Sequence, residues 1–334
     1  KSPDALAHDV AEAIAAAQQP PGQVSTLIIP ADVQWGETQN PVPPIPQIPK
    51  PAAVEDETLN AVATRIRSAR KAALLLGAGA LDAAGQRAAG AIAAATGAHL
   101  IAETFPARWE RGGDLPAIER LPYFPEQASA VLAAYDTLVL AGARAPVAFF
   151  GYPDHPSQLS AEATTVTLST PAQDSPGALT GLAEALGAKA SQASSSPISK
   201  PNAADEPLNP ATVGTILAGR LPENAIVIEE AATTGLPFYA ASTQAPTHTL
   251  LSLTGGAIGQ GLPCAVGAAL ACPNRKVIAF QADGSAQYTI QSLWTLAREG
   301  LDVVVLLCSN RSYRILQVEL ARAGITEPGA QAKA

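Results

Sequence analysis

Two short polar clusters near the end of the chain have the residue types of a cation site. Asp283 and Gly284 come shortly after one apolar run, and Asn310 follows the next apolar run, 27 positions after Asp283. A carboxylate and a carboxamide provide the oxygen ligands that Mg²⁺ prefers. Because they carry only one formal charge between them, the ion would stay positive and would attract further anionic oxygen. A diphosphate supplies that oxygen, so the clusters predict a metal and a phosphate group at one site.

The turn after Asp283 also suits an anion. Gly284 lets the chain turn closely, and Ser285 is expected to begin a helix whose free N–H groups and positive dipole end favour a phosphate. A purely structural explanation is open for each cluster alone, because Asp-Gly is a common turn and Asn often caps a helix.

Two further stretches favour a ligand site over that structural explanation. Residues 255–263, GGAIGQGLP, place four glycines around Ile258. This composition suits close approach of the backbone to a flat ligand that one apolar side chain supports. Residues 229–235, EEAATTG, follow another apolar run and suit a second phosphate-binding turn. Three strand ends are therefore expected to converge on one ligand.

The elements that would position these residues alternate between strand and helix. In the last part of the chain, strands are expected over residues 225–230, 276–280 and 302–308. Such alternation predicts parallel strands joined by crossovers, and ligands gather outside the carboxyl ends of such strands. One crossover returns the chain to a neighbouring strand, so Asp283 and Asn310 are expected to lie side by side.

The middle of the chain shows the same alternation. Its apolar runs are residues 72–79, 98–103, 136–143 and 164–170, with helical stretches between and after them. The predicted fold class is therefore α/β, with two doubly wound parallel-sheet domains and the remnant of a third.

The remnant is the first block, which contains one helix and one strand. Ser2 as N-cap and Pro3 at the first helical position predict the helix, and residues 24–30, VSTLIIP, predict the strand. One helix and one strand cannot form a domain, so this block is expected to dock on the rest of an α/β domain. The chain contains no Met and opens on Lys1, which indicates a piece of a longer polypeptide.

A Pro-rich and a Ser-rich connector divide the chain. The first is expected to be an extended spacer and the second a flexible crossing between domains. The predicted segments are the remnant (1–39), the Pro-rich linker (40–54), the middle domain (55–188), the Ser-rich linker (189–207) and a last domain shortened at its C-terminus (208–334).

Composition excludes several kinds of partner. Of the 334 residues, 47% are hydrophobic and 15% charged, and the net charge of −8 includes no basic stripe of the kind that nucleic acid requires. No apolar run reaches the roughly 20 residues of a membrane span, and the N-terminus lacks the order of a signal peptide, so a cytoplasmic location is expected. Cys264, Cys272 and Cys308 lack metal-site spacing and are expected to be buried thiols.

The scattered histidines are expected to be structural, because none has a partner at catalytic spacing, and the arginines are expected to be solvated. Arg314 is the exception that is close enough to Asn310 to meet a substrate carboxylate. The residues concerned are His8, His99, His155, His248, Arg108, Arg111, Arg314 and Arg322.

Asp-Gly-Ser followed one crossover later by Asn resembles the thiamine diphosphate (ThDP) motif of the pyruvate decarboxylase and acetohydroxyacid synthase superfamily. The family form begins Gly-Asp-Gly and often ends Asn-Asn, whereas this chain has Ala282 before Asp283 and Ser309 before Asn310. Residues 283–294, DGSAQYTIQSLW, are especially similar to benzoylformate decarboxylases. The whole chain is similar to the acetolactate-synthase-like group.

The resemblance implies roles for particular residues. Asp283 and Asn310 would bind Mg²⁺ through their side chains and Ser312 through its backbone carbonyl. Ile258 would be the wedge that bends the cofactor, and the Gly256 carbonyl would accept a hydrogen bond from the aminopyrimidine. The residues implied in holding ThDP are Ala232, Thr233, Gly256, Ala257, Ile258, Asp283, Gly284, Ser285, Tyr288, Asn310, Ser312 and Tyr313.

The resemblance also implies a reaction and an assembly. It implies a ThDP- and Mg²⁺-dependent enzyme for 2-oxo acids, either a decarboxylase or an acetolactate-type carboligase that works through a ThDP enamine. The family acts as homodimers or homotetramers with the site across subunits, and a Glu of the N-terminal domain activates the cofactor. Only the last helix and strand of that domain match here, so the catalytic Glu is unidentified and the chain alone is expected to be inactive.

Alternatives from other classes stay open. The chain could be a non-catalytic binding or oligomerisation module that keeps the cofactor fold. FAD in the middle domain is neither supported nor excluded by the sequence. A nicotinamide dehydrogenase ranks last, because Gly77 and Gly79 lack a third motif glycine, which would fall at Asp82, and no acidic ribose ligand stands at the expected place.

Overall fold

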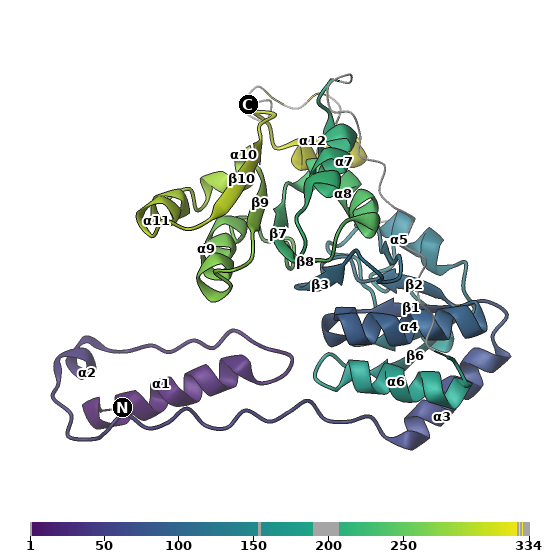
Figure 1. Cartoon of the computed structure of the whole chain (residues 1–334), viewed down its shortest axis with the longest axis horizontal. Helices are drawn as coiled ribbons and strands as arrows, with labels where there is room; N and C mark the ends of the chain where they lie inside the picture. Colours follow the sequence, from purple (N-terminus) through teal and green to yellow (C-terminus); the bar gives the residue numbers. More distant parts are fainter. Residues whose placement is uncertain (1, 153–154, 190–206, 326, 328, 330–334) are drawn as a thin grey trace.

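A computed structural model describes residues 2–152, 155–189, 207–325, 327 and 329. Two five-stranded sheets with helices on their faces dominate it (Figure 1). The predicted class of two α/β domains with largely parallel sheets is confirmed. Residues 190–206, most of the predicted Ser-rich linker, lie outside the described residues. No helix in the described part of the chain is long and apolar enough to cross a membrane.

The first sheet is entirely parallel and forms where the middle runs were predicted. Its strands, in order across the sheet, are β4 (Glu119–Arg120), β2 (His99–Ala102), β1 (Ala72–Leu76), β5 (Thr137–Ala141) and β6 (Thr165–Ser169). The chain order reverses between β1 and β5, which is the doubly wound arrangement.

Both faces of the first sheet are covered by helices, which explains why its central strands are apolar throughout. Leu74 and Leu76 enter one core cluster, with α3 (Asp56–Ser68), α4 (Ala83–Thr96) and α6 (Ser175–Leu186). Leu75 enters the other, with α5 (Pro125–Leu132). Figure 1 shows α5 on one side of β1 and β2 and α4 and α6 on the other.

The second sheet carries the predicted ligand site. Its strands, in order, are β10 (Val303–Cys308), β9 (Val277–Ala282), β7 (Ala225–Glu230), β8 (His248–Ser252) and β3 (Trp109–Arg111). The first four are mutually parallel, and β3 is antiparallel to β8.

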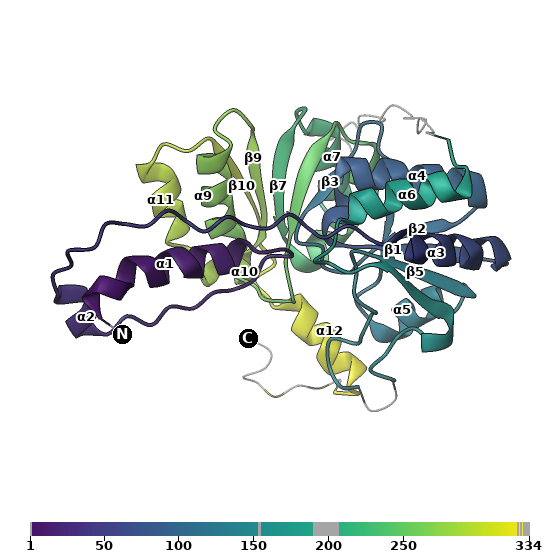
Figure 2. The ribbon, with the colours of Figure 1, turned by 90° about the horizontal axis from the view of Figure 1, so that it is seen from below.

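Helices again cover both faces of the second sheet. α7 (Pro210–Arg220) and α8 (Leu236–Ala241) pack on one face, and α9 (Gly261–Ala271) packs on the other with α11 (Ser292–Arg298) beside it. Figure 2 shows α9 and α11 across the sheet from α7. Asn209 caps the start of α7, because its side chain accepts from the Ala211 and Thr212 N–H groups at 2.9 and 3.1 Å. Two short helices, α10 (Asp283–Gln287) and α12 (Arg314–Arg322), follow β9 and β10.

Strand β3 joins the two domains and was not predicted. It belongs to the chain segment of the first domain, yet it pairs with β8 of the second sheet, Arg111 opposite His248. Three residues, WER, are too short and too polar to show a strand pattern.

The prediction that Arg111 is solvated was wrong. The residue is only 3% exposed, its guanidinium stacks on Trp109 at 3.9 Å, and burial lowers its pKa to about 9.

Helices α1 (Pro3–Gln18) and α2 (Ala31–Trp35) lie apart from the two sheet domains (Figure 1), whereas Ala52, near the end of the Pro-rich linker, pairs with Gln173 of the first domain. The predicted helix is confirmed as α1, and the second helix, α2, was not predicted. The predicted strand over 24–30 was wrong, since these residues pair with no described strand, and Val24 and Ile28 are 94% and 84% exposed. A strand forms only against a neighbour, and this segment has none among the described residues.

Candidate functional site

Four parallel strands end at the same edge of the second sheet. The pairing of β9 with β10 ends at Ala282 opposite Cys308, so the next residues, Asp283 and Ser309, leave the sheet side by side. The turns after β7 and β8 follow along the same edge, because β7 pairs with both β9 and β8. The predicted convergence of strand ends is therefore present in the structure.

Asp283 contacts the turn after β10 directly. Its Oδ2 accepts hydrogen bonds from the Arg311 N–H at 2.8 Å and the Ser309 hydroxyl at 3.1 Å, and its Oδ1 accepts from the Gly284 N–H at 3.0 Å. Asn310 lies in that turn and is exposed, and its Oδ1 accepts from the Ser312 N–H at 2.9 Å. The Asp283 carboxylate and the turn that carries Asn310 therefore lie at the same edge, and carboxylate and carboxamide oxygens are ligands that suit a hard cation.

A cation at this edge would depend on those few oxygens. Within the described ranges, no group of three or more His, Cys, Asp or Glu side chains could hold a metal ion. The backbone of the turn is also unusual, because Arg311 adopts a left-handed φ of +52° although it is not glycine. Such conformations cluster at functional sites, since the surrounding structure has to hold them in place.

The helix after Asp283 differs from the prediction. α10 begins at Asp283 itself and is five residues long, so Ser285 lies inside it, with only 4% of its surface exposed. The expectation that Ser285 begins the helix was wrong, because the turn closes directly after the strand. A single turn also has few aligned peptide dipoles, so it offers a phosphate less than a long helix would.

Two tyrosines pack on glycines around this edge. A Cβ at Gly284 would come within 2.7 Å of the Tyr313 ring, so the glycine lets the ring lie against the backbone. Gly259, with a φ of +102°, is in the same relation to the Tyr288 side chain, at 2.8 Å. Tyr288 is 62% exposed and Tyr313 41%, so both rings are accessible to a ligand.

The turn after β7 contains the predicted Ala232 and Thr233, which are both half-buried. Ala232 has a left-handed φ of +50°. The preceding Glu229 is buried, and it accepts from the Ala231 N–H at 2.9 Å and from the Tyr239 hydroxyl at 2.7 Å. Burial raises the pKa of Glu229 above its usual range. A buried carboxylate thus fixes the start of this turn.

The glycine-rich turn after β8 is held by the next residue, Glu230, which sequence analysis did not single out. Within the turn, Gly256 and Ala257 are exposed and Ile258 is half-buried. Glu230 is 2% exposed and bonds to three consecutive backbone N–H groups that follow Ile258. The sequence signal that could have identified this role is the pair Glu229-Glu230 at the end of an otherwise apolar strand. Because an apolar strand of this kind is buried on both faces, its two glutamates are expected to be buried as well and to need hydrogen-bond partners.

Helix α12 connects the turn after β10 to the first domain. Arg322 donates to both carboxylate oxygens of Glu126 and lies over the Phe124 ring at 4.2 Å, and the Tyr152 hydroxyl donates to Glu319 at 3.3 Å. Arg322 is exposed, as predicted, but its guanidinium is paired with Glu126. Arg314 is exposed and bonds to Gln317.

We expect replacement of Glu126 by Gln to lower the free energy of unfolding by up to about 1 kcal/mol at neutral pH, because the pair is partly exposed. Arg322 lowers the pKa of Glu126 to about 2. The stabilisation is therefore complete above the unfolded pKa of about 4.3 and is lost as the pH falls toward about 2. Melting temperatures of wild type and variant should converge over that range. The exposed Glu223→Gln variant is the control, and a difference that persists at pH 2 would contradict the assignment.

The three cysteines are half-buried and unpaired, so the expectation of buried thiols was wrong. Cys308 ends β10, an edge strand that pairs with β9 alone among the described strands.

The four histidines make contacts that are typical of structural residues. His8 and His99 pair with glutamates, His155 lies 4.0 Å from Glu126, and His248 is buried with its Nδ1 2.8 Å from the Pro246 carbonyl oxygen.

The turns at the carboxyl ends of β1, β2 and β5 in the first domain contact one another. A Cβ at Gly142, after β5, would come within 2.4 Å of the Gly77 carbonyl oxygen, so the turns after β1 and β5 touch. Glu103, which sequence analysis missed as an acid after β2, accepts from the Ala78 N–H at 3.3 Å. Burial raises the pKa of Glu103. The Asp82 carboxylate caps α4 where a pyrophosphate would bind in a dinucleotide site.

We therefore expect the purified protein to show no flavin absorbance. The groups that a dinucleotide would contact already have partners within the chain, so FAD would have to displace the Gly77–Gly142 contact. The measurement is a visible absorbance spectrum of the protein before and after denaturation. A flavin released in a one-to-one ratio would contradict this expectation.

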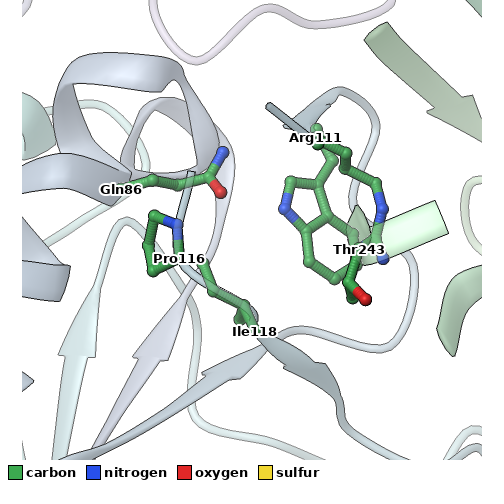
Figure 3. A pocket seen from close by; sticks show the side chains of 7 residues that line it. Gln86, Arg111, Pro116, Ile118 and Thr243 are labelled. Carbon is green, nitrogen blue, oxygen red and sulfur yellow. The ribbon is translucent and has the colours of Figure 1, made fainter. Parts of the chain in front are cut away.

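A small cavity between the domains is separate from the candidate site. Gln86, Arg111, Pro116, Ile118 and Thr243 lie around it (Figure 3). Its volume of about 10 Å³ is at the lower limit for one water molecule, so it cannot hold an organic cofactor.

Comparisons with known proteins cover the domain that carries the candidate site. Residues 234–331 match the family model described as "Thiamine pyrophosphate enzyme, C-terminal TPP binding domain". A provisionally named acetolactate synthase large subunit, IlvX, of Mycobacterium tuberculosis is 42% identical over 96% of this chain and 62% of its own length. The chain thus spans less than two thirds of that relative. A benzoylformate decarboxylase of Pseudomonas aeruginosa is 35% identical over 33% of this chain and 21% of its own length.

Solved structures show the same fold. A provisionally assigned thiamin diphosphate-dependent enzyme from Mycobacterium smegmatis has a TM-score of 0.72 and 27% identity, over 97% of this chain and 68% of its own. The ThDP-dependent 4-hydroxybenzoylformate decarboxylase of Rhodococcus jostii RHA1 has a TM-score of 0.76 over 99% of this chain and 66% of its own, and at 22% identity it supports the fold alone. The matching domain, the relatives and the shared fold together show that the chain is similar to thiamine pyrophosphate-dependent enzymes, with residues 234–331 matching their C-terminal TPP binding domain.

Proposed function

We propose that this protein binds ThDP together with Mg²⁺ at the carboxyl edge of its second sheet and acts on a 2-oxo acid, by non-oxidative decarboxylation or by acetolactate-type carboligation. The observation that supports this most is the contact of Asp283 with the turn of residues 309–311, at the same edge as the turns after β7 and β8. The relatives named as acetolactate synthase and benzoylformate decarboxylase point to the same chemistry.

In this proposal, different residues at the strand ends bind the metal, the diphosphate and the ring system of the cofactor. Asp283, Asn310 and the Ser312 carbonyl hold the metal, and Ala232, Thr233, Gly284 and Ser285 hold the diphosphate. Ile258, Gly256 and Ala257 support the ring system from the glycine-rich turn, while Tyr288 and Tyr313 line the edge. When bound, ThDP supplies the carbon that takes up the electrons released as carbon dioxide leaves.

Assembly and location form a further part of this proposal. The protein works as a homodimer or homotetramer in the cytoplasm, with residues of two copies meeting at each site. Light scattering on the purified protein tests the assembly, and a monomer at all concentrations would contradict it.

Calorimetric titration of the protein in its natural full length with ThDP, with and without Mg²⁺, tests the binding. A screen for carbon dioxide release from a series of 2-oxo acids then tests the chemistry. Mg²⁺-dependent binding with release from one of these acids supports the proposal. Binding without release from any of them would favour the non-catalytic module, and no binding would refute the site.

A further inference from the structure

The carboxylate of Glu230 lies directly beneath the glycine-rich turn that separates β8 from α9. Its Oε1 accepts from the Gly259 N–H at 2.7 Å and the Gln260 N–H at 3.1 Å, and its Oε2 accepts from the Gly261 N–H at 3.1 Å. Three consecutive peptide groups thus point at one carboxylate, which belongs to a strand 29 positions earlier in the chain. This arrangement fixes the turn from the side opposite to solvent.

Burial makes this carboxylate costly unless it is bonded. Glu230 is 2% exposed, and burial raises its pKa, while the hydrogen bonds from the three N–H groups act in the opposite direction. Space around it is also limited, because a Cβ at Gly261 would come within 2.6 Å of its Oε2. The carboxylate and the turn therefore fit each other closely, and neither can shift alone.

The turn gains order from such an anchor because three of its residues are glycines with left-handed φ values, although Gln260 also bonds to Thr254 and to the Ser252 carbonyl. Gly255, Gly256 and Gly259 all have left-handed φ values, +60°, +72° and +102°. Glycine loses more conformational freedom on ordering than any other residue, so a free glycine-rich turn would populate many shapes. Beyond the Glu230 bonds, Gly259 is held by one side-chain bond to its carbonyl, from the Thr289 hydroxyl at 2.8 Å.

We propose that Glu230 is a positioning residue, which holds residues 255–261 in the conformation that accepts the cofactor before the cofactor binds. This inference rests on the proposed function. Glu230 acts through Gly259, Gln260 and Gly261. By holding these residues it sets the position of the Ile258 side chain and the direction of the Gly256 carbonyl. If only a fraction of molecules has the turn in this shape, the apparent affinity falls by that fraction.

The test uses Glu230→Gln on the full chain, which preserves size but replaces one acceptor oxygen by an NH₂ group. At least one of the three bonds is then lost, and an N–H donor faces another donor. We expect the Kd for ThDP in the presence of Mg²⁺ to rise about tenfold or more, as for a lost hydrogen bond to a charged group. Glu103→Gln is the matched control, because this partly buried carboxylate holds one backbone N–H in the first domain, and it should leave the Kd unchanged.

A second measurement does not depend on the cofactor. Amide hydrogen exchange of the peptide that covers residues 255–262, without ThDP, should be faster in Glu230→Gln and unchanged in Glu103→Gln. Glu230→Asp is added in case the Gln variant does not fold. It keeps the charge but is one methylene shorter, so it cannot reach all three N–H groups, and the same two changes are expected.

Faster exchange together with weaker binding, confined to the Glu230 variants, supports the inference. Unchanged exchange overturns it, and so does faster exchange with an unchanged Kd, because the turn would then not be prepared for the cofactor. Equal losses in the Glu103 variant also overturn it, since they indicate a general effect of removing a carboxylate. If the wild type itself does not bind ThDP, the proposed function is wrong, and the exchange data alone decide whether Glu230 holds the turn.

Discussion

Replacing Asp283 by alanine is expected to raise the Kd for ThDP in the presence of Mg²⁺ by at least about 100-fold, since even partners of metal ligands contribute up to that much. Asp283 is the carboxylate at the edge where β9 and β10 end, and it also holds the turn of residues 309–311 through the Arg311 N–H and the Ser309 hydroxyl. Its loss removes both the charge that attracts the cation and the bonds that order Asn310. Calorimetric titration at several Mg²⁺ concentrations measures the effect.

Asp302→Ala is the matched control for this prediction. Asp302 directly precedes β10, at the opposite edge of the same sheet, and its side chain is 71% exposed in a surface pair with Lys276. It should bind ThDP like the wild type, because surface pairs contribute little and the strand ends are untouched. An Asp283→Ala protein that binds ThDP with unchanged Mg²⁺ dependence would refute the metal assignment.

Replacing Phe280 by alanine is expected to lower the free energy of unfolding by about 3–5 kcal/mol, the usual cost of removing a large buried aromatic side chain. Phe280 lies in β9 and is fully buried, and its ring packs edge-on against Phe238 of α8 with centroids 5.9 Å apart. Its core cluster continues through Trp109 of β3 into the first domain. Urea denaturation followed by tryptophan fluorescence measures the change.

Phe150→Ala removes the same side chain from an exposed place, since Phe150 is 60% exposed. Its effect should stay within about 0.5 kcal/mol. A Phe280→Ala protein as stable as this control would show that the shared core does not hold the second sheet. Phe280→Ala, but not Phe150→Ala, is also expected to weaken ThDP binding, because Phe280 lies in β9, the strand that positions Asp283.

Local patterns predicted much of the fold correctly. The four apolar runs of the first domain became four strands of its sheet, β1, β2, β5 and β6, and the runs that end before Asp283 and Asn310 became neighbouring parallel strands. Both results follow from periodicity and crossover geometry, which are properties of short segments and of their order. The same reasoning brought Asp283 to the turn of Asn310, and the contacts of Asp283 with Ser309 and Arg311 agree with it.

Other features depended on partners far away in the chain. The strand over residues 24–30 did not form because no described strand pairs with it, and β3 formed because β8 offers a free edge. Arg111 was misjudged for the same reason, since its burial comes from Trp109 and from the second domain. A pattern of side chains cannot show which neighbour a segment will have.

The sequence by itself therefore determined the two parallel α/β domains, the place of the strand ends and the residue types gathered there. Only the tertiary structure decided that Glu230 lies beneath the glycine-rich turn, that Glu103 bonds to the turn after β1, and that Arg322 binds Glu126 from α12. The physical reason is that the two partners in each of these contacts are separated by 25 to 196 positions in the sequence. They come together only when the helices have packed on the sheets. Their burial and their hydrogen bonds exist only in that packed arrangement.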